Sequence, residues 1–149
     1  MSKTLTRKEI EDIIPHRGTM LLLDGAKNMT KTSATGLHNV RDDEFWCCGH
    51  FPGNPVMPGV LQVEALAQTA CLVALKAMMD KFPDQRGAGY FTKIENCKFT
   101  RMVLPGDVLE LEVNQIMNKL TLYKFHGVAK VRGETACEAT FSAIMQFGN

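Results

Sequence analysis

Hydrophobic and polar residues alternate through most of the C-terminal part of the chain. Between residues 108 and 117, apolar side chains at 109, 111 and 113 alternate with polar ones at 110, 112 and 114. A period of two is that of a β-strand with one buried face. Together with turn residues at 105–107, 118–119 and 132–133, the pattern predicts four strands in a consecutive meander, over residues 90–101, 108–117, 120–132 and 134–147.

The N-terminal part combines a helix start signal with weaker strand signals. Thr6 and Glu9 form a capping box, which predicts a short helix with Ile10 on its apolar face, ended by Pro15. Asp24-Gly25 predicts a turn after the apolar residues 20–23. A looser alternation over residues 27–40 predicts a strand with one solvated face.

Residues 60–79 form the longest apolar stretch and predict a central helix. It is long enough to span a membrane. Gln62, Glu64, Gln68 and Lys76 interrupt it, and a charged side chain costs about 2.5 to 3.5 kcal/mol at the centre of a bilayer. A helix buried in a soluble protein is therefore the better interpretation, and no membrane partner is expected.

The polar residues of this helix fall into two groups. At 100° per residue from Glu64, Gln62, Thr69 and Lys76 lie at about 160°, 140° and 120°, which predicts a solvent-facing stripe. Gln68 lies beside Glu64 at about 40°, on the opposite, leucine-rich side. Because an unpaired buried charge is costly, Glu64 is expected either at a cleft or paired in the core.

Composition agrees with one soluble domain over residues 1–149. With 149 residues, 45% hydrophobic and 22% charged, the chain can bury a substantial core. The predicted class is α+β, with an antiparallel sheet wrapped around a long central helix. A formal net charge of +1 gives no bulk attraction for nucleic acid, and none is expected as a partner. Five cysteines without paired spacing, and a polar start at residues 1–4, predict reduced thiols and a cytoplasmic location.

The segment 49–59 differs in kind from the rest of the chain. It holds three prolines and three glycines, which predicts a shaped loop. The loop presents His50 and ends in Pro58-Gly59 at the N-terminus of the central helix, where free amides favour a developing negative charge. With Glu64 on the same helix, these parts suit acid/base chemistry beside a carbonyl.

Simpler interpretations compete with this one. A lone histidine is more often structural than catalytic, and His16, His38 and His126 have no partner that the sequence identifies. Cys48-Gly49-His50 lacks the second ligand pair of a zinc site, so no metal is expected. A nucleophilic cysteine at 47 or 48 is disfavoured, because the acidic residues 42–44 raise thiol pKa values.

The string at residues 49–68, GHFPGNPVMPGVLQVEALAQ, resembles the signature of hot-dog-fold (3R)-hydroxyacyl-[acyl-carrier-protein] dehydratases of the FabZ type. The likeness extends to Ile-Pro-His-Arg at 14–17, to Leu-Leu-Leu-Asp at 21–24, and to residues 94–99 and 103–107. It implies dehydration of (3R)-hydroxyacyl-acyl-carrier-protein to the trans-2-enoyl product in fatty acid biosynthesis, without a cofactor.

The resemblance also assigns roles to residues. His50 and Glu64 would be the catalytic pair, supported by Gln68, and the amides of Gly59 and Val60 would polarise the thioester carbonyl. Candidates for an acyl tunnel are Phe51, Met57, Leu61, Tyr90 and Phe91, with Tyr90 as a gate. Candidates for docking the acidic acyl carrier protein with its phosphopantetheine-linked acyl chain are Lys93, Lys98 and Arg101.

The resemblance implies an assembly as well. Two subunits would join as a homodimer in which His50 of one faces Glu64 of the other, and dimers could further associate as a trimer of dimers. A cis bond at Asn54-Pro55 is predicted to brace the loop.

Three alternatives stay open at this point. A FabA-like dehydratase and isomerase shares much of the loop, although it usually carries Asp and Cys where this chain has Glu64 and Val60. A hot-dog hydratase or thioesterase acting on acyl-CoA is the second. The third is a non-catalytic acyl-binding subunit, a role that would not require both His50 and Glu64.

Overall fold

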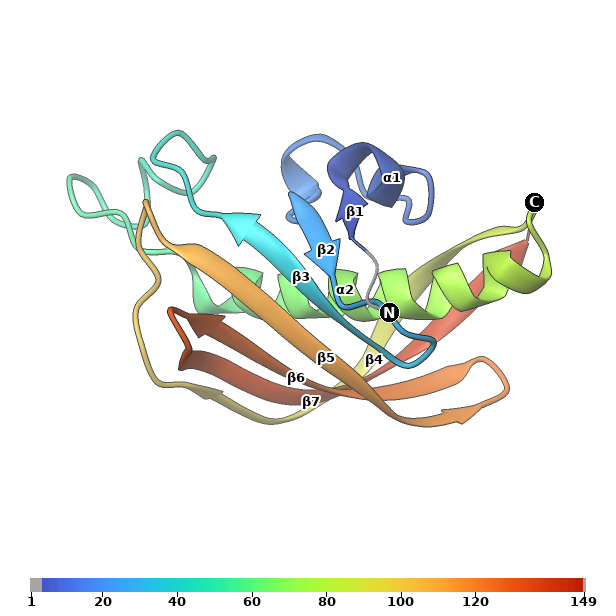
Figure 1. Cartoon of the computed structure of the whole chain (residues 1–149). Helices are drawn as coiled ribbons and strands as arrows, with labels where there is room; N and C mark the ends of the chain where they lie inside the picture. Colours follow the sequence, from blue (N-terminus) through green and yellow to red (C-terminus); the bar gives the residue numbers. More distant parts are fainter. Residues whose placement is uncertain (1–3, 149) are drawn as a thin grey trace.

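The computed structural model describes residues 4–148 and contains one antiparallel sheet curved around a long helix (Figure 1). Seven strands follow the order β1-β2-β3-β5-β6-β7-β4, and the helix α2 (Gly59–Lys81) runs across the concave face of this sheet. The predicted sheet wrapped around a central helix is confirmed. Residues 1–3, part of the polar start from which a cytoplasmic location is predicted, lie outside the described residues.

The remaining elements have the following bounds. They are β1 (Leu5–Thr6), α1 (Arg7–Glu11), the 3-10 helix η1 (Gly18–Met20), β2 (Gly25–Lys27), β3 (Ser33–Asn39), β4 (Arg86–Phe99), β5 (Val108–Lys119), β6 (Leu122–Val131) and β7 (Glu134–Gly148).

The capping box forms as predicted. The Thr6 hydroxyl accepts from the Glu9 amide at 3.2 Å, and the Thr6 amide donates to Glu9 Oε1 at 3.0 Å. Two amide donors that would otherwise lack partners at the start of α1 are thereby satisfied. Ile10, on the inner face of α1, is fully buried.

Helix α2 is more enclosed than its sequence predicts. Gln62 and Thr69 are 3% and 0% exposed, so the predicted solvent-facing stripe is wrong for both. The sheet curves around one side of the helix and the N-terminal segment covers the other, which leaves mainly the C-terminal turns, with Lys76, near solvent (Figure 1). The buried Thr69 hydroxyl is hydrogen-bonded, because it donates to the Ala65 carbonyl at 3.0 Å.

Helix α2 is apolar and long enough to cross a bilayer. However, 67% of its most apolar stretch is buried among the described residues, as in a soluble core helix.

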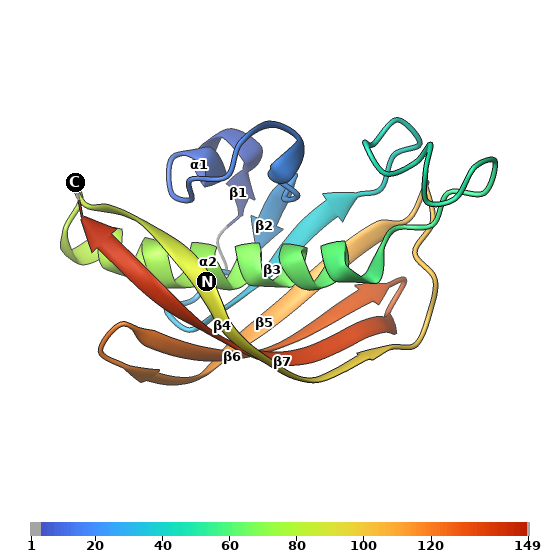
Figure 2. The same ribbon diagram turned by 180° about the vertical axis from the view of Figure 1, so that it is seen from behind.

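Strand β4 does not belong to a consecutive meander, which corrects the predicted topology. It pairs with β7 and forms an edge of the sheet, while β5 pairs with β3 and β6 (Figure 2). Because β3 occupies the outer side of β5, β4 cannot pair with β5 there and lies instead beyond β7. The exposed strand carries large apolar side chains, among them Tyr90, Ile94 and Phe99.

Local boundaries also differ from the prediction. The chain bends at Asp24, and strand β2 starts directly at Gly25, so no separate turn follows the apolar residues 20–23. The Asp24 amide donates to the Leu37 carbonyl next to the pairing of β2 with β3. The predicted strand 27–40 is divided by a turn at 28–32. The hairpin between β5 and β6 turns at residues 120–121, two residues later than the predicted turn at 118–119. A register shift in β5, between Gln115 and Met117, precedes this turn.

Sheet and helix lie close together at Gly36 on β3. A Cβ atom built there would lie 2.3 Å from Thr69 Oγ1 and 3.0 Å from Leu23 Cδ2. Both neighbours are buried in the core, so neither can move away freely. Glycine at this position therefore sets the spacing of α2 and β3.

We expect Gly36→Ala to lower the free energy of unfolding by about 1 to 3 kcal/mol through overpacking. Gly49→Ala is the matched control, because a Cβ at Gly49 meets no atom within 4 Å. Denaturant unfolding of both variants at one fixed protein concentration measures the difference. Equal midpoints for the two variants would show that this contact does not limit the helix–sheet spacing.

Candidate active site

The loop of residues 40–58 leads from β3 to the N-terminus of α2 (Figure 1). It carries His50, which lines the same cavity as Gly59 at the start of α2. The His50 amide donates to the Trp46 carbonyl at 2.9 Å, and the His50 carbonyl accepts from the Val56 amide at 2.8 Å. The Met57 amide donates to the Val103 carbonyl at 2.8 Å, which ties the loop to the segment after β4. The prediction of a shaped loop is confirmed.

The predicted cis bond at Asn54-Pro55 is wrong. The cis peptide bond recorded among the described residues joins His50 to Phe51. Phe51 and Asn54 exchange two backbone hydrogen bonds, at 3.0 and 2.8 Å, and these close the turn before the chain reaches Pro55.

The ring of His50 is oriented by its own loop. His50 Nδ1 lies 2.7 Å from the Val56 carbonyl oxygen, and the ring stacks on Phe51 with centroids 4.1 Å apart. Because a carbonyl oxygen can only accept, Nδ1 carries a proton. In the neutral imidazole, Nε2 is then the atom with a free lone pair, as a general base requires.

The first turn of α2 supplies donors next to this ring. The helix starts at Gly59, and its first bonded amide is that of Leu61, which donates to the Pro58 carbonyl at 3.0 Å. The amides of Gly59 and Val60 precede it and have no acceptor within the helix. The Phe99 ring packs against Gly59 so closely that a Cβ would lie 2.6 Å from Phe99 Cε1. Because glycine has no Cβ, residue 59 leaves room for the Phe99 ring beside the start of α2.

A cavity of about 540 Å³ gathers several of the predicted site residues. Its lining includes His50, Met57, Gly59, Val60, Phe99 and Arg101. Its rim is apolar and open, because Val60 and Met102 are 74% and 68% exposed. The cavity therefore combines a base, two backbone donors and apolar walls.

Glu64 lies in a second, smaller cavity of about 40 Å³, lined also by His16, Gln68 and Phe91. Gln68 is fully buried and uses both ends of its amide. Its Nε2 donates to Glu64 Oε2 at 2.9 Å and to the Met20 carbonyl at 2.7 Å, while its Oε1 accepts from the Leu22 amide at 2.9 Å. Gln68 thus fixes the Glu64 carboxylate against the N-terminal segment.

His16 is a neighbour of Glu64 that the sequence does not reveal. Its Nε2 lies 3.7 Å from Glu64 Oε2. Burial lowers the pKa of His16, and the nearby Glu64 carboxylate offsets this only in part. The two residues are 48 positions apart (64 minus 16) on different elements, so no local pattern relates them.

One chain does not bring His50 and Glu64 together. They line the two different cavities, which share no lining residue. Of the tunnel candidates, Met57 lines the larger cavity and Phe91 the smaller, whereas Phe51 stacks on His50 and Leu61 packs against the core. Tyr90 is 55% exposed on the edge strand β4 and lines neither of these cavities.

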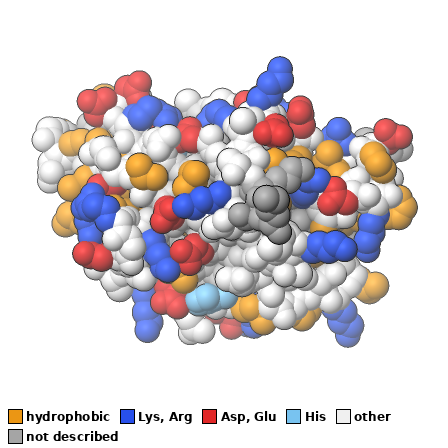
Figure 3. Space-filling view, in the orientation of Figure 1, with side chains coloured by type: hydrophobic (Ala, Val, Ile, Leu, Met, Phe, Trp, Pro, Cys, Tyr) orange, Lys and Arg blue, Asp and Glu red, His pale blue; other side chains and the backbone are white. Residues whose placement is uncertain are grey.

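The docking candidates form no large basic patch. Lys93 lies 3.8 Å from Glu95, and Arg101 pairs with Glu134 at 2.5 Å. Lys98 is exposed and makes no ion pair with any residue in the described range 4–148. On the face seen in Figure 3, basic and acidic side chains are intermixed.

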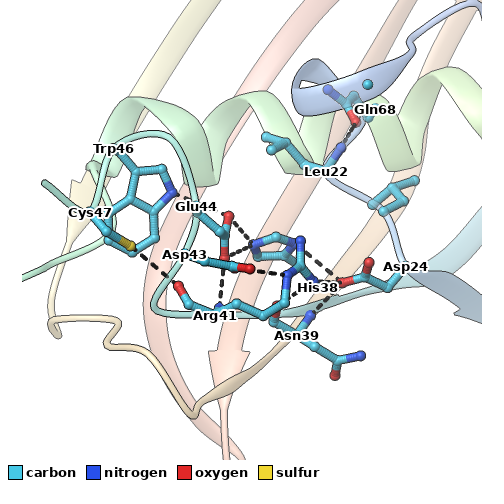
Figure 4. Close-up of polar contacts among 12 residues, drawn as sticks. Leu22, Asp24, His38, Asn39, Arg41, Asp43, Glu44, Trp46, Cys47 and Gln68 are labelled. Atoms are coloured by element: carbon cyan, nitrogen blue, oxygen red, sulfur yellow. Dashed lines mark hydrogen bonds and ion pairs between the residues drawn. The ribbon is translucent and has the colours of Figure 1, made fainter.

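Two further histidines have partners that the sequence does not identify. His126 pairs with Glu138 at 3.0 Å across β6 and β7. His38 is buried between the carboxylates of Asp24 and Glu44 (Figure 4).

Comparison with known proteins agrees with this geometry. The family of FabA-like domains matches residues 14–140. The 3-hydroxyacyl-[acyl-carrier-protein] dehydratase FabZ of Acetivibrio thermocellus is 46% identical, covering 95% of this chain and 94% of that protein. The FabZ of a Jannaschia species is 45% identical, covering 91% and 85%.

Solved structures with little sequence identity share the fold. One from the dehydratase heterocomplex ApeI:P of Xenorhabdus doucetiae has a TM-score of 0.81 at 16% identity, covering 92% of this chain and 90% of that one. A hypothetical thioesterase with coenzyme A from Streptococcus pneumoniae has a TM-score of 0.61 at 14% identity, covering 79% and 81%. The sequence-predicted hot-dog fold is confirmed.

We expect Gln68→Leu to lower the free energy of unfolding by about 1 to 3 kcal/mol, because it leaves the buried Leu22 amide without a partner and removes the part-buried bond to the Met20 carbonyl. Gln146→Leu, on the exposed part of β7, is the control. Chemical denaturation followed by circular dichroism gives both values. A Gln68 variant as stable as the Gln146 variant would contradict the anchoring role.

Proposed function

Because the chain belongs to the FabA-like domain family, we propose that it dehydrates (3R)-hydroxyacyl-acyl-carrier-protein to trans-2-enoyl-acyl-carrier-protein, with His50 and Glu64 as its catalytic pair. This dehydration belongs to fatty acid biosynthesis and is the activity named for the relatives at 41–46% identity. The observation that carries the residue assignment is the orientation of His50, whose Nδ1 proton is held by Val56 beside the free amides of α2.

The reaction follows from these positions. Nε2 of His50 removes the α-proton of the thioester while the amides of Gly59 and Val60 stabilise the charge that develops on the carbonyl oxygen. Glu64 orients the β-hydroxyl, and the proton that Nε2 has taken up passes to this hydroxyl, which leaves as water. The C–H and C–O bonds break and the electron pair forms the Cα–Cβ double bond. The apolar walls of the larger cavity hold the acyl chain.

The working unit is a dimer with shared sites. The separate cavities of His50 and Glu64 favour this arrangement, since neither is a complete site. The free edge of β4 and its exposed apolar side chains offer a surface on which a second sheet can pair. His50 of one subunit then faces Glu64 of the other.

A cytoplasmic location fits the same proposal. All five cysteines are free thiols, as expected in a reducing compartment.

Product analysis tests the function directly. Incubation with (3R)-hydroxyacyl-acyl-carrier-protein should give a product lighter by one water, with its double bond at carbon 2. A double bond at carbon 3 would instead indicate the FabA-like isomerase, and hydrolysis to free acid would indicate a thioesterase. Mass spectrometry and NMR of the released acyl group distinguish these three outcomes.

Mixing inactive variants tests the shared site. His50→Ala and Glu64→Ala should each abolish activity, whereas dimers re-formed from an equal mixture should regain about a quarter of wild-type activity, because half are mixed and each mixed dimer has one intact site. Dehydration of an acyl-carrier-protein substrate measures the recovery. If both residues acted within one chain, the mixture would stay inactive.

Lys98 tests carrier-protein docking. Because acyl carrier proteins are acidic, Lys98→Glu should raise KM about three- to tenfold for the carrier-protein substrate and leave kcat and the KM of a pantetheine thioester unchanged. Lys31→Glu makes the same charge change in the turn between β2 and β3 and is the control. Equal effects of both variants, or equal effects on both substrates, would contradict docking at Lys98.

A further inference from the structure

A buried cluster of charged groups lies at the base of the His50 loop, outside both cavities that hold the catalytic pair (Figure 4). His38 on β3 is 1% exposed. Its Nε2 lies 3.1 Å from both carboxylate oxygens of Glu44, and its Nδ1 lies 3.5 Å from Asp24 Oδ2. The imidazole is thus enclosed between two carboxylates that come from different segments of the chain.

This arrangement selects the charged form of the ring. An ionised carboxylate can only accept, so both ring nitrogens must carry protons to face Asp24 and Glu44 favourably. Burial opposes the charge, but the hydrogen bonding to Glu44 and the attraction of both carboxylates outweigh it and raise the pKa of His38 to about 9.

Glu44 connects the ring to the catalytic loop. Glu44 Oε1 accepts from the indole Nε1 of Trp46 at 3.2 Å, and Oε2 accepts from the Arg41 amide at 2.8 Å. Trp46 is 4% exposed, and its carbonyl accepts from the His50 amide at 2.9 Å. Two short links therefore join the Glu44 carboxylate to the backbone of the catalytic base.

We propose that His38 is a positioning residue, whose imidazolium clamps Glu44 against Asp24 and thereby holds His50 in its reactive place. When the ring loses its proton, it loses its charge and keeps an N–H for only one of the two carboxylates, and the loop that carries His50 loosens. The proposal deepens the proposed function and rests on it. It makes turnover sensitive to alkaline pH through a group remote from the substrate.

The other groups that face the cluster keep their charge state in this range. Arg7 and Arg41 approach Asp24 at 3.3 and 3.5 Å, and Arg41 also lies 3.7 Å from Asp43. Arginine stays protonated and aspartate ionised between pH 7 and 10. Cys47 donates to the Arg41 carbonyl, and burial raises the pKa of its thiol above the ordinary value of 9.0. His38 is therefore the group of this cluster that changes charge first as pH rises above neutrality.

The stability contribution has a definite sign. The folded pKa of about 9 lies above the ordinary histidine value of 6.5, so the charged ring stabilises the native state fully below pH 6.5. That contribution is lost as pH rises through about 9. The same titration should appear in kcat, because a misplaced base slows the chemical step more than it weakens substrate binding.

The test measures kcat and KM against pH for the wild type, Glu44→Gln and His38→Lys. We expect the alkaline fall of wild-type kcat to centre near pH 9, with KM nearly constant. Glu44→Gln keeps an acceptor for Trp46 but removes a charge, so it should shift the fall to lower pH by about one to two units. His38→Lys keeps a cation and should shift the fall to higher pH.

His126→Gln is the matched control, because His126 pairs with Glu138 on β6 and β7 and does not contact the loop. Its pH profile should equal that of the wild type. NMR titration of the His38 ring gives the second measurement and needs no activity, so it separates this proposal from the dehydratase assignment. A ring that titrates near its ordinary 6.5 would overturn the proposal. A Glu44→Gln profile that coincides with the wild type would do the same.

Discussion

The structure depends on how α2 is buried. When a helix is enclosed by its own sheet on one side and by the N-terminal segment on the other, a polar group that it carries inward is costly unless it is hydrogen-bonded. Gln68 meets this requirement with three hydrogen bonds, to the Met20 carbonyl, the Leu22 amide and the Glu64 carboxylate. The same side chain therefore fixes the N-terminal segment on the helix and orients Glu64 in its cavity. The buried side-chain amide of Gln68 thus contributes both to the packing of the core and to the geometry of the site.

The local elements could be predicted from the sequence, and the long-range relations could not. The capping box at Thr6, the helix after Pro58 and the alternating strands depend on neighbouring residues, and all of them form. The burial of Gln62 and Thr69 depends on how far the sheet curves and on what covers its open side. The placement of β4 depends on which strand occupies the outer side of β5. Neither the curvature of the sheet nor the order of its strands can be predicted from the spacing of apolar residues within one element.

For the candidate site too, local features could be predicted from the sequence and long-range relations could not. The motif at residues 49–68 predicts which residues matter, because loop, helix start and carboxylate are close in sequence. It does not reveal that His50 and Glu64 line separate cavities, since that separation follows from the direction in which each side chain leaves the loop and the helix. The two separate cavities favour the proposed arrangement in which a second copy of the chain completes each site.

Two buried histidines show how geometry decides charge where the residue type does not. His16 has one carboxylate at 3.7 Å, and the cost of burial prevails, so its pKa is lowered and it is neutral beside Glu64. His38 has two carboxylates, with two oxygens at 3.1 Å and one at 3.5 Å, and their attraction prevails over burial. A neutral His16 adds no full positive charge beside the Glu64 carboxyl. A charged His38 contacts Glu44, and the proposed positioning of His50 runs through Glu44 and Trp46. Burial thus decides the charge of one histidine, and two neighbouring carboxylates decide that of the other.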